Sequence, residues 1–305
     1  MWVVKEKVKS KMILIQFVMV FFVLLFDWDG SITRSDTLEL IAPLPHEIKR
    51  GTRFQYYQDA YSDDYNSFVT HFGQVSSRET MYEYLNAIRD VELRSLERIE
   101  RGGLFYGTKN EQRFKRMSRV EFRDGWHGMQ AWLSEKTAQG ALEAQIVSVN
   151  WSRDCILHAL LQEAKLSHVQ PSIYRIHSNE LETFPGTDVC TGRIVGPCGH
   201  DRIVTGIDKL HVCQTLVSED SKNVSVYVGD SVTDLACMLW AQVGILIGPG
   251  TSVKRILGEA GLAHLLHTLA SWMDLNASNR RQAIVHVTDW NEVKQLLTQI
   301  GQYLT

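Results

Sequence analysis

The chain has 305 residues, more than one small domain needs, so we expect one large domain with an insertion or appendage. A hydrophobic fraction of 44%, a charged fraction of 22% and a net charge of −3 are typical of a soluble globular protein and give no global attraction to nucleic acid or to an anionic membrane. The five cysteines include no CxxC pair, which argues against a disulfide framework and favours a reducing compartment, so we expect a cytoplasmic protein.

The amino-terminal segment allows two interpretations. Lysines at positions 5, 7, 9 and 11 precede an apolar run over residues 12–26, a pattern that resembles a secretory signal. The run ends in Asp-Trp-Asp without a small-residue cleavage pattern, and it is shorter than the roughly 20 residues that span a membrane. We therefore expect residues 1–12 to lie outside the core and residues 20–26 to form the first core strand. A membrane anchor is the alternative.

The segment FFVLLFDWDGSIT, residues 21–33, places two carboxylates directly after an apolar strand. Asp27 and Asp29 lie one residue apart, and Gly30 follows as a turn signal. Two carboxylates at the end of a buried strand repel each other and lose water, so a cation between them would stabilise the arrangement. The sequence therefore predicts a cation site at the end of the first strand.

Residues 36–122 have a helical pattern without the alternation typical of β-strands. Within them, residues 79–101 are predicted to form one long charged helix with an apolar stripe, and the glycine pair at 102–103 would end it. We expect this region to be a helical insertion. It would be inserted between residues 13–35 and 123–305, which together would form the core.

After residue 122, predicted strands and helices alternate along the chain. Strands are predicted at residues 144–149, 173–176, 224–228, 243–247 and 283–287, and helices near 125–140, 153–164, 209–216, 234–240 and 293–300. Residues 192–195 are expected to form part of a hairpin. This alternation is typical of an α/β fold, with a parallel sheet covered by helices on both faces. In such sheets, ligands bind beyond the carboxyl ends of the strands.

The ends of these strands supply further polar side chains. Ser148 lies at the end of the second strand, Asp230 and Asp234 follow the strand over residues 224–228, and Lys209 opens the helix before it. If the strand ends converge, one cavity contains four carboxylates, a hydroxyl and an ammonium group. Ligation by oxygen atoms alone favours Mg²⁺. The predicted metal ligands are Asp27, Asp29, Asp230 and Asp234.

These positions predict a division of roles in phosphoryl transfer. A phosphoryl group is the natural anion to bridge the metal and Lys209. Asp27, on the rigid strand, is the candidate nucleophile and would form an aspartyl-phosphate, whereas Asp29 would protonate the leaving alcohol and then deprotonate the attacking water. The predicted phosphate-binding residues are Ser148, Asn150, Lys209 and Gly30, with a turn role as the alternative for Asn150.

Four motifs of this chain resemble those of the haloacid dehalogenase superfamily. DWDGSIT, IVSVNWS, the DKL around Lys209 and GDSVTDL occur in the family's order, within residues 20–250. The resemblance implies a Rossmann-like core, Mg²⁺ dependence and the catalytic roles given above. Dehalogenases of the family lack the second aspartate and transport ATPases carry threonine there, so Asp29 implies a phosphatase or a phosphomutase.

Two further resemblances concern the branch of the family. The helical region, residues 36–122, resembles the cap domain of the phosphoserine phosphatase-like branch. HSNELE at residues 177–182, the following TGRIV and GDSVTDLACML resemble the phosphatase domain of plant thiamin monophosphate phosphatases. Phosphoserine phosphatases commonly have Gly-Gly-Phe where this chain has Val149-Asn150-Trp151, which argues against phosphoserine as the substrate.

We therefore predict a Mg²⁺-dependent phosphatase that hydrolyses a small phosphorylated metabolite through an aspartyl-phosphate. A phosphomutase would use the same residues, and a non-catalytic regulator on a phosphatase fold is the second alternative. The expected partner is the metabolite alone, without nucleic acid or membrane. The identity of the metabolite and the oligomeric state stay open.

Overall fold

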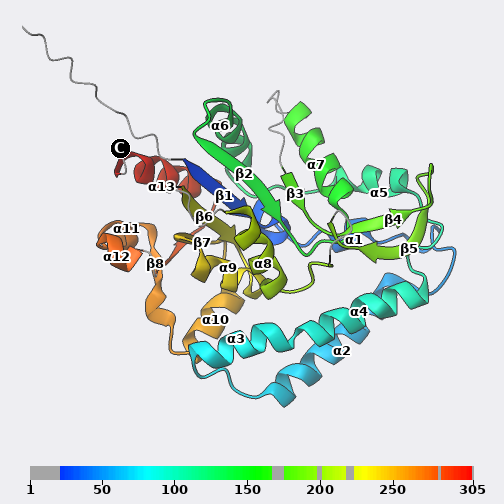
Figure 1. Cartoon of the computed structure of the whole chain (residues 1–305). Coiled ribbons are helices and arrows are strands. Elements are labelled where there is room, and N and C mark those ends of the chain that lie inside the picture. Colours follow the sequence, from blue (N-terminus) through cyan, green and yellow to red (C-terminus); the bar gives the residue numbers. More distant parts are fainter. Residues whose placement is uncertain (1–20, 167–174, 198–200, 218–222, 281–282, 304–305) are drawn as a thin grey trace, which may run out of the picture.

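Figure 1 shows a computed structural model of the chain, built around one twisted sheet. The structure describes residues 21–166, 175–197, 201–217, 223–280 and 283–303, so the expectations for residues 1–12 and 13–20 lie outside the described residues. The sheet has seven strands in the order β3-β2-β1-β6-β7-β9-β8. Their bounds are β1 (Phe22–Phe26), β2 (Leu142–Val147), β3 (Arg175–His177), β6 (Val224–Gly229), β7 (Val243–Ile247), β8 (Leu266–Thr268) and β9 (Ile284–Val287).

Every neighbouring pair in this sheet is parallel, as the sequence predicts. The last residue of β1, Phe26, is level with Ile146 of β2 on one side and with Val228 of β6 on the other. The strand order reverses at β1, because β2 and β3 lie on one side of it and β6 and β7 on the other. This reversal is the switch point where parallel sheets bind ligands, beyond the carboxyl ends of β1 and β6.

Helices cover both faces of the sheet (Figure 1). One face is covered by α6 (Trp126–Ala138), α7 (Arg153–Leu166) and α13 (Trp290–Tyr303), and the other by α8 (Gly206–Leu216), α9 (Leu235–Trp240) and α10 (Thr251–Glu259). Within β1, the side chains of Phe22, Leu24 and Phe26 pack in the hydrophobic core on the face covered by α6, α7 and α13. Those of Val23 and Leu25 pack in the core on the opposite face. All five are buried because successive strand residues point to opposite faces, which explains the continuous apolar run. The Rossmann-like α/β fold is confirmed.

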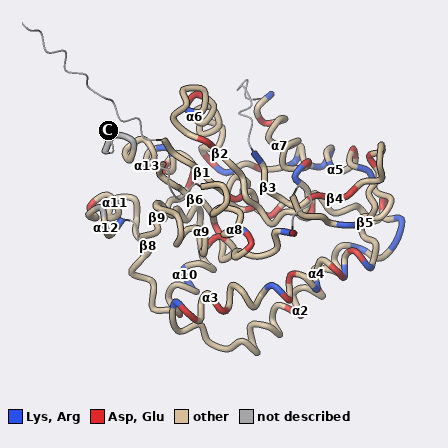
Figure 2. Tube along the Cα trace, viewed as in Figure 1, with Lys and Arg blue, Asp and Glu red and all other residues tan. Residues whose placement is uncertain are grey.

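The predicted cap region, residues 36–122, contains five helices and no named strand. They are α1 (Leu38–Ile41), α2 (Phe54–Phe72), α3 (Arg78–Ala87), α4 (Arg89–Gly102) and α5 (Asn110–Met117). The chain leaves and re-enters the core side by side, since Thr33 and Phe122 form an antiparallel bridge. Figure 2 shows basic and acidic residues interspersed along α4. The division into cap and core stays a prediction.

The single long helix predicted over residues 79–101 is wrong in one respect, because the chain divides it into α3 and α4 at Ile88. Directly after the break, Arg89 forms an ion pair with Asp208 of α8. The helical periodicity of a sequence reports local structure, so it does not predict this contact between distant segments. The predicted end of the helix is confirmed, since Gly103 follows α4 in the left-handed conformation, with φ +73°.

A hairpin outside the main sheet lies against the predicted cap. It consists of β4 (Glu180–Thr183) and β5 (Cys190–Val195), which pair antiparallel. Gly107 N–H donates to the Cys190 carbonyl at 2.9 Å, and Cys190 N–H donates to the Thr108 carbonyl at 2.8 Å. The sequence predicts part of this hairpin at residues 192–195 but not β4. It also misses β8, α10, α11 (Leu269–Met273) and α12 (Ala277–Arg280).

None of the helices that the structure describes combines the length and the apolar character needed to cross a membrane.

Candidate active site

The loop after β1 places Asp27 at the switch point of the sheet. Asp27 N–H donates to the Val228 carbonyl at 3.0 Å, which ties the end of β1 to the end of β6. A tight turn over Trp28–Ile32 follows, in which Gly30 has φ +69°. A Cβ atom on Gly30 would lie 2.3 Å from Oδ2 of Asp230, so glycine is needed both for the backbone conformation and for the approach of the two loops.

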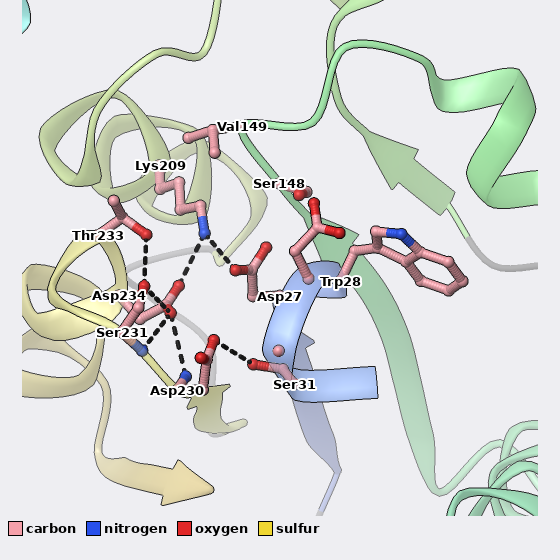
Figure 3. Close-up of polar contacts among 12 residues, drawn as sticks. Asp27, Trp28, Ser31, Ser148, Val149, Lys209, Asp230, Ser231, Thr233 and Asp234 are labelled. Carbon is pink, nitrogen blue, oxygen red and sulfur yellow. Dashed lines mark hydrogen bonds and ion pairs between the residues drawn. The ribbon is translucent and has the colours of Figure 1, made fainter. Parts of the chain in front are cut away.

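Lys209 is the cation of the site (Figure 3). Its Nζ lies 2.8 Å from Oδ2 of Asp27 and 2.8 Å from Oδ1 of Asp234, and the side chain is fully buried. The residue is on the first turn of α8, whose start is fixed by a reciprocal cap between Thr205 and Asp208. Burial alone would lower the pKa of Lys209, but Asp234 and Asp27 outweigh it, so the pKa lies above its usual value and the side chain is charged.

Asp234 holds the loop after β6 in place. Its Oδ2 accepts hydrogen bonds from the backbone N–H groups of Asp230 and Ser231, both at 3.1 Å. Its Oδ1 accepts from Lys209 Nζ and from the buried hydroxyl of Tyr227, both at 2.8 Å. Asp234 therefore connects α8, β6 and the loop that carries Asp230. Figure 3 shows its contacts with Lys209 and with that loop.

Three carboxylates form a cluster that fits a divalent cation. Within the described residues, one oxygen each from Asp27, Asp230 and Asp234 lie within 4.8 Å of one another. With all three carboxylates ionised and Lys209 as the paired cation, the cluster has three negative charges and one positive charge. Oδ1 of Asp27 is buried and has no hydrogen-bond partner among the described residues, which is costly for a carboxylate oxygen without a ligand. The donor set of oxygen atoms suits a hard cation such as Mg²⁺.

Burial and mutual repulsion raise the pKa values of two carboxylates of the cluster. Burial, followed by the charges of Asp234 and Asp27, raises the pKa of Asp230 to about 8. Burial also raises the pKa of Asp27 to about 6, although the neighbouring Lys209 opposes the shift. A cation bound among them would remove the repulsion and restore the ionised forms.

Asp29 lies outside this cluster. Its Oδ1 accepts hydrogen bonds from the backbone and the hydroxyl of Thr37, and its Oδ2 accepts one from the Asn150 amide. Burial and the charge of Asp36 raise the pKa of Asp29 to about 7. The structure thus places the two aspartates of the first motif in different surroundings, and the predicted role of the Asp29 side chain as a metal ligand stays a prediction.

The other predicted phosphate-binding residues lie directly after β2. Ser148 is fully buried, and its hydroxyl accepts a hydrogen bond from Asn150 N–H at 3.3 Å. Among the described residues, the Ser148 hydroxyl has no acceptor for its own proton, and its predicted role in phosphate binding stays a prediction. The side-chain amide of Asn150 is engaged by Asp29 and Thr37, so this residue supports Asp29.

Sequence reasoning missed four residues that shape the site. Thr37 binds Asp29, Tyr227 binds Asp234, and the Arg123 guanidinium donates to the backbone carbonyls of Gly30 and Ser31. Trp290 also donates to the Ser31 carbonyl, at 3.0 Å. None of the four belongs to a recurrent motif. Only Tyr227, a hydroxyl within an otherwise apolar strand, gives a signal that could have identified it.

The chain is similar to several known proteins. A CTO1 family protein of Schizosaccharomyces pombe is 23% identical over 236 residues, which cover 76% of this chain and 84% of that protein. The bifunctional TH2 protein of Arabidopsis thaliana, named as mitochondrial, is 26% identical over 191 residues, 61% of this chain and 29% of that protein. A structure of phosphoserine phosphatase as a phospho-aspartyl intermediate analogue has a TM-score of 0.47 and 12% identity, and covers 90% of this chain and 98% of that chain.

A family model described as haloacid dehalogenase-like hydrolase matches residues 24–239. The match includes all four motifs and confirms the predicted family and the prediction of a hydrolase. The chain belongs to the haloacid dehalogenase-like hydrolases.

Proposed function

We propose that this protein is a Mg²⁺-dependent phosphatase that hydrolyses a small-molecule phosphomonoester through an aspartyl-phosphate on Asp27. The observation that carries the proposal is the environment of Asp27. One of its oxygens is fixed by Lys209, whereas the other is buried without a hydrogen-bond partner among the described residues, at the switch point of the sheet. A carboxylate held in this way is oriented for attack and free to bond.

The metal would be held by Asp27 and Asp230, with Asp234 in support. Asp234 already accepts hydrogen bonds from five donor groups, so its oxygens are less available as ligands. The donors are Lys209 Nζ, the hydroxyls of Tyr227 and Ser231, and the backbone N–H groups of Asp230 and Ser231. A bound Mg²⁺ would neutralise negative charge on the phosphoryl oxygens and so make attack by a carboxylate possible.

In the first step, a carboxylate oxygen of Asp27 attacks phosphorus while the bond between phosphorus and the leaving oxygen breaks. The electron pair of that bond goes to the leaving oxygen, which takes a proton from Asp29 and departs as an alcohol. Lys209 and Ser148 bind the phosphoryl oxygens in both steps. Lys209 is buried next to Asp27, and Ser148 is buried directly after β2, the strand beside β1.

In the second step, water attacks the phosphorus of the aspartyl-phosphate. Asp29, now ionised, takes a proton from that water, and the bond between phosphorus and Asp27 breaks. The products are inorganic phosphate and the original carboxylate, so the cycle balances without a further reactant. The small metabolite and the cytoplasmic location remain predictions of the same proposal.

The experiment is hydrolysis of p-nitrophenyl phosphate by the purified protein, with Mg²⁺ and with EDTA. We expect Mg²⁺-dependent release of phosphate, and loss of at least about a hundredfold in Asp27→Asn, since the nucleophile is removed. Asp64→Asn is the matched control, because Asp64 pairs with Arg98 in the predicted cap, away from the cluster. Turnover that is unaffected by EDTA or by Asp27→Asn would contradict the proposal.

The substrate is sought with a panel of phosphorylated metabolites that includes thiamin monophosphate. A true substrate should exceed p-nitrophenyl phosphate in kcat/KM, because binding energy from the rest of the molecule contributes to catalysis. Release of free phosphate supports a phosphatase. Formation of an isomeric phosphate would instead support a phosphomutase.

A further inference from the structure

Thr37 is the centre of a hydrogen-bond network around Asp29. Its backbone N–H donates to Oδ1 of Asp29 at 2.7 Å, and its hydroxyl lies 2.6 Å from the same oxygen. The hydroxyl also lies 3.0 Å from Nε1 of Trp28 and 3.1 Å from Nδ2 of Asn150. Thr37 and Asn150 are 2% and 1% exposed, and Trp28 is fully buried.

The donor and acceptor inventory fixes the direction of each bond. The indole of Trp28 and the amide nitrogen of Asn150 are donors only, so they occupy the two acceptor sites of the Thr37 hydroxyl. The single hydroxyl proton of Thr37 must then point to Asp29. Oδ1 of Asp29 therefore accepts two hydrogen bonds, which fill its two lone-pair directions.

Asn150 completes the arrangement at the second oxygen. Its Nδ2 donates to Oδ2 of Asp29 at 2.8 Å. The orientation of the amide is fixed because its Oδ1 accepts a hydrogen bond from Ser152 N–H at 3.1 Å. Oδ2 thus accepts one bond and keeps one lone-pair direction, whereas Oδ1 keeps none. Asp29 itself is only partly buried, so a ligand can reach it.

We propose that Thr37, oriented by Trp28 and Asn150, is a positioning residue that makes Oδ2 of Asp29 the proton-transferring atom of the reaction. The inference rests on the proposed phosphatase function. When Asp29 is in its acid form, the proton can lie only on Oδ2. It passes from Oδ2 to the leaving oxygen as the bond between that oxygen and phosphorus breaks, and Asp29 is left as a carboxylate. Thr37 acts through Asp29 and is not a member of the cluster of Asp27, Asp230 and Asp234.

The position of Thr37 in the chain adds a second consequence. It precedes α1, at the start of the predicted cap, whereas Asp29 and Asn150 belong to core loops after β1 and β2. The network therefore fixes the acid of the core by a residue from the segment that leads into the cap. Thr37, at this junction, thus orients the Asp29 carboxyl group although it belongs to none of the four sequence motifs.

The test compares two substrates that differ in their need for an acid. p-Nitrophenyl phosphate releases a stable p-nitrophenolate anion, whereas the benzyl alkoxide oxygen must be protonated as it leaves, so hydrolysis of benzyl phosphate depends on the position of the acid. We expect Thr37→Val to lower kcat/KM for benzyl phosphate about tenfold more than kcat/KM for p-nitrophenyl phosphate. Thr37→Ser keeps the hydroxyl and should restore the wild-type ratio. This ratio reports the step in which the leaving group departs, and loss of folded protein does not change it.

Two controls separate the inference from a structural effect and from the proposed function. Thr108→Val removes another buried hydroxyl, which donates to the Phe105 carbonyl and accepts from Arg113, and it should leave the ratio unchanged. Asp29→Asn and Asp29→Asn with Thr37→Val should show the same ratio, because Thr37 acts through Asp29. Equal losses with both substrates in Thr37→Val, or failure of Thr37→Ser to restore the ratio, would overturn the inference. Absence of wild-type turnover would instead refute the phosphatase function itself.

Discussion

Replacement of Asp230 by asparagine tests the charge balance of the candidate metal site. The oxygens of Asp27, Asp230 and Asp234 lie within 4.8 Å of one another, so each pair of charges repels by roughly 3 kcal/mol at an effective dielectric constant of about 20. For Asp230, two anionic neighbours and one cationic neighbour leave a net repulsion of about one such pair. Asparagine keeps the shape and an acceptor for the Ser31 hydroxyl, but it removes the charge.

The effect has a definite sign and pH range. Folding raises the pKa of Asp230 from an ordinary value of 3.8 to about 8, so the folded state binds its proton more tightly than the unfolded state does. Without metal, wild-type stability therefore falls as pH rises from about 4 to about 8. Above pH 8 in EDTA, we expect Asp230→Asn to raise the free energy of unfolding by about 1–3 kcal/mol.

Addition of Mg²⁺ should reverse the order of the two proteins. At a concentration of 100 times the dissociation constant, a ligand stabilises the folded state by about 2.7 kcal/mol, and we expect this gain in the wild type but little of it in Asp230→Asn. Chemical denaturation with Mg²⁺ and with EDTA measures both values. The control, Asp64→Asn, should lose at most about 1 kcal/mol and keep the Mg²⁺ effect. A variant that is less stable than wild type in EDTA and equally stabilised by Mg²⁺ would refute the reasoning.

Three further predictions concern stability and metal binding. Lys209→Met leaves buried carboxylates without their cation, so we expect a loss of about 3–5 kcal/mol in denaturation with EDTA, together with loss of turnover. Gly30→Ala forces a Cβ against Asp230 at φ +69°, so it should weaken Mg²⁺ binding in a titration followed by thermal stability. Burial raises the pKa of Glu92 from 4.5 to about 7 in the folded state, so wild-type stability falls as pH rises through that range. Relative to wild type, Glu92→Gln should gain up to about 3 kcal/mol between pH 4.5 and 8, measured by denaturation at both pH values.

Each of these predictions has a contradicting result. For Lys209→Met it is unchanged stability in EDTA, because the buried carboxylates would then be neutral or solvated. For Gly30→Ala it is wild-type Mg²⁺ affinity. For Glu92→Gln it is a stability difference from wild type that stays constant with pH, because the Glu92 carboxyl, which accepts from Tyr61, would then titrate normally.

The main sheet and most of the site could be predicted from the sequence, because both depend on local features. The central strands β1, β6 and β7 are short, mostly apolar runs, and Asp27 and Asp230 directly follow β1 and β6, as Ser148 directly follows β2. Parallel strands bring their carboxyl ends to one edge, so residues that follow the strands meet there. Lys209 was identified by its place in the ordered motifs, and the structure brings it between Asp27 and Asp234.

The parts that could not be predicted depend on contacts between distant segments. Thr37 reaches Asp29 across a loop that carries no periodic signal, and the break at Ile88 accompanies the ion pair of Arg89 with a helix far along the chain. The strand β4 is short and, among the described residues, pairs only with β5, so neither alternation nor length identifies it. In each case the determining contact is tertiary, and a single sequence does not show it.

The most direct test of the central claim is detection of phosphate on Asp27 during turnover. Rapid acid quenching of the reaction with p-nitrophenyl phosphate and Mg²⁺, followed by mass spectrometry of the peptides, should find one phosphoryl group on the peptide that contains Asp27, and none in Asp27→Asn or in EDTA. The label should appear at least as fast as phosphate is released. Release of phosphate without a label on Asp27, or a label on another residue, would contradict the proposed nucleophile.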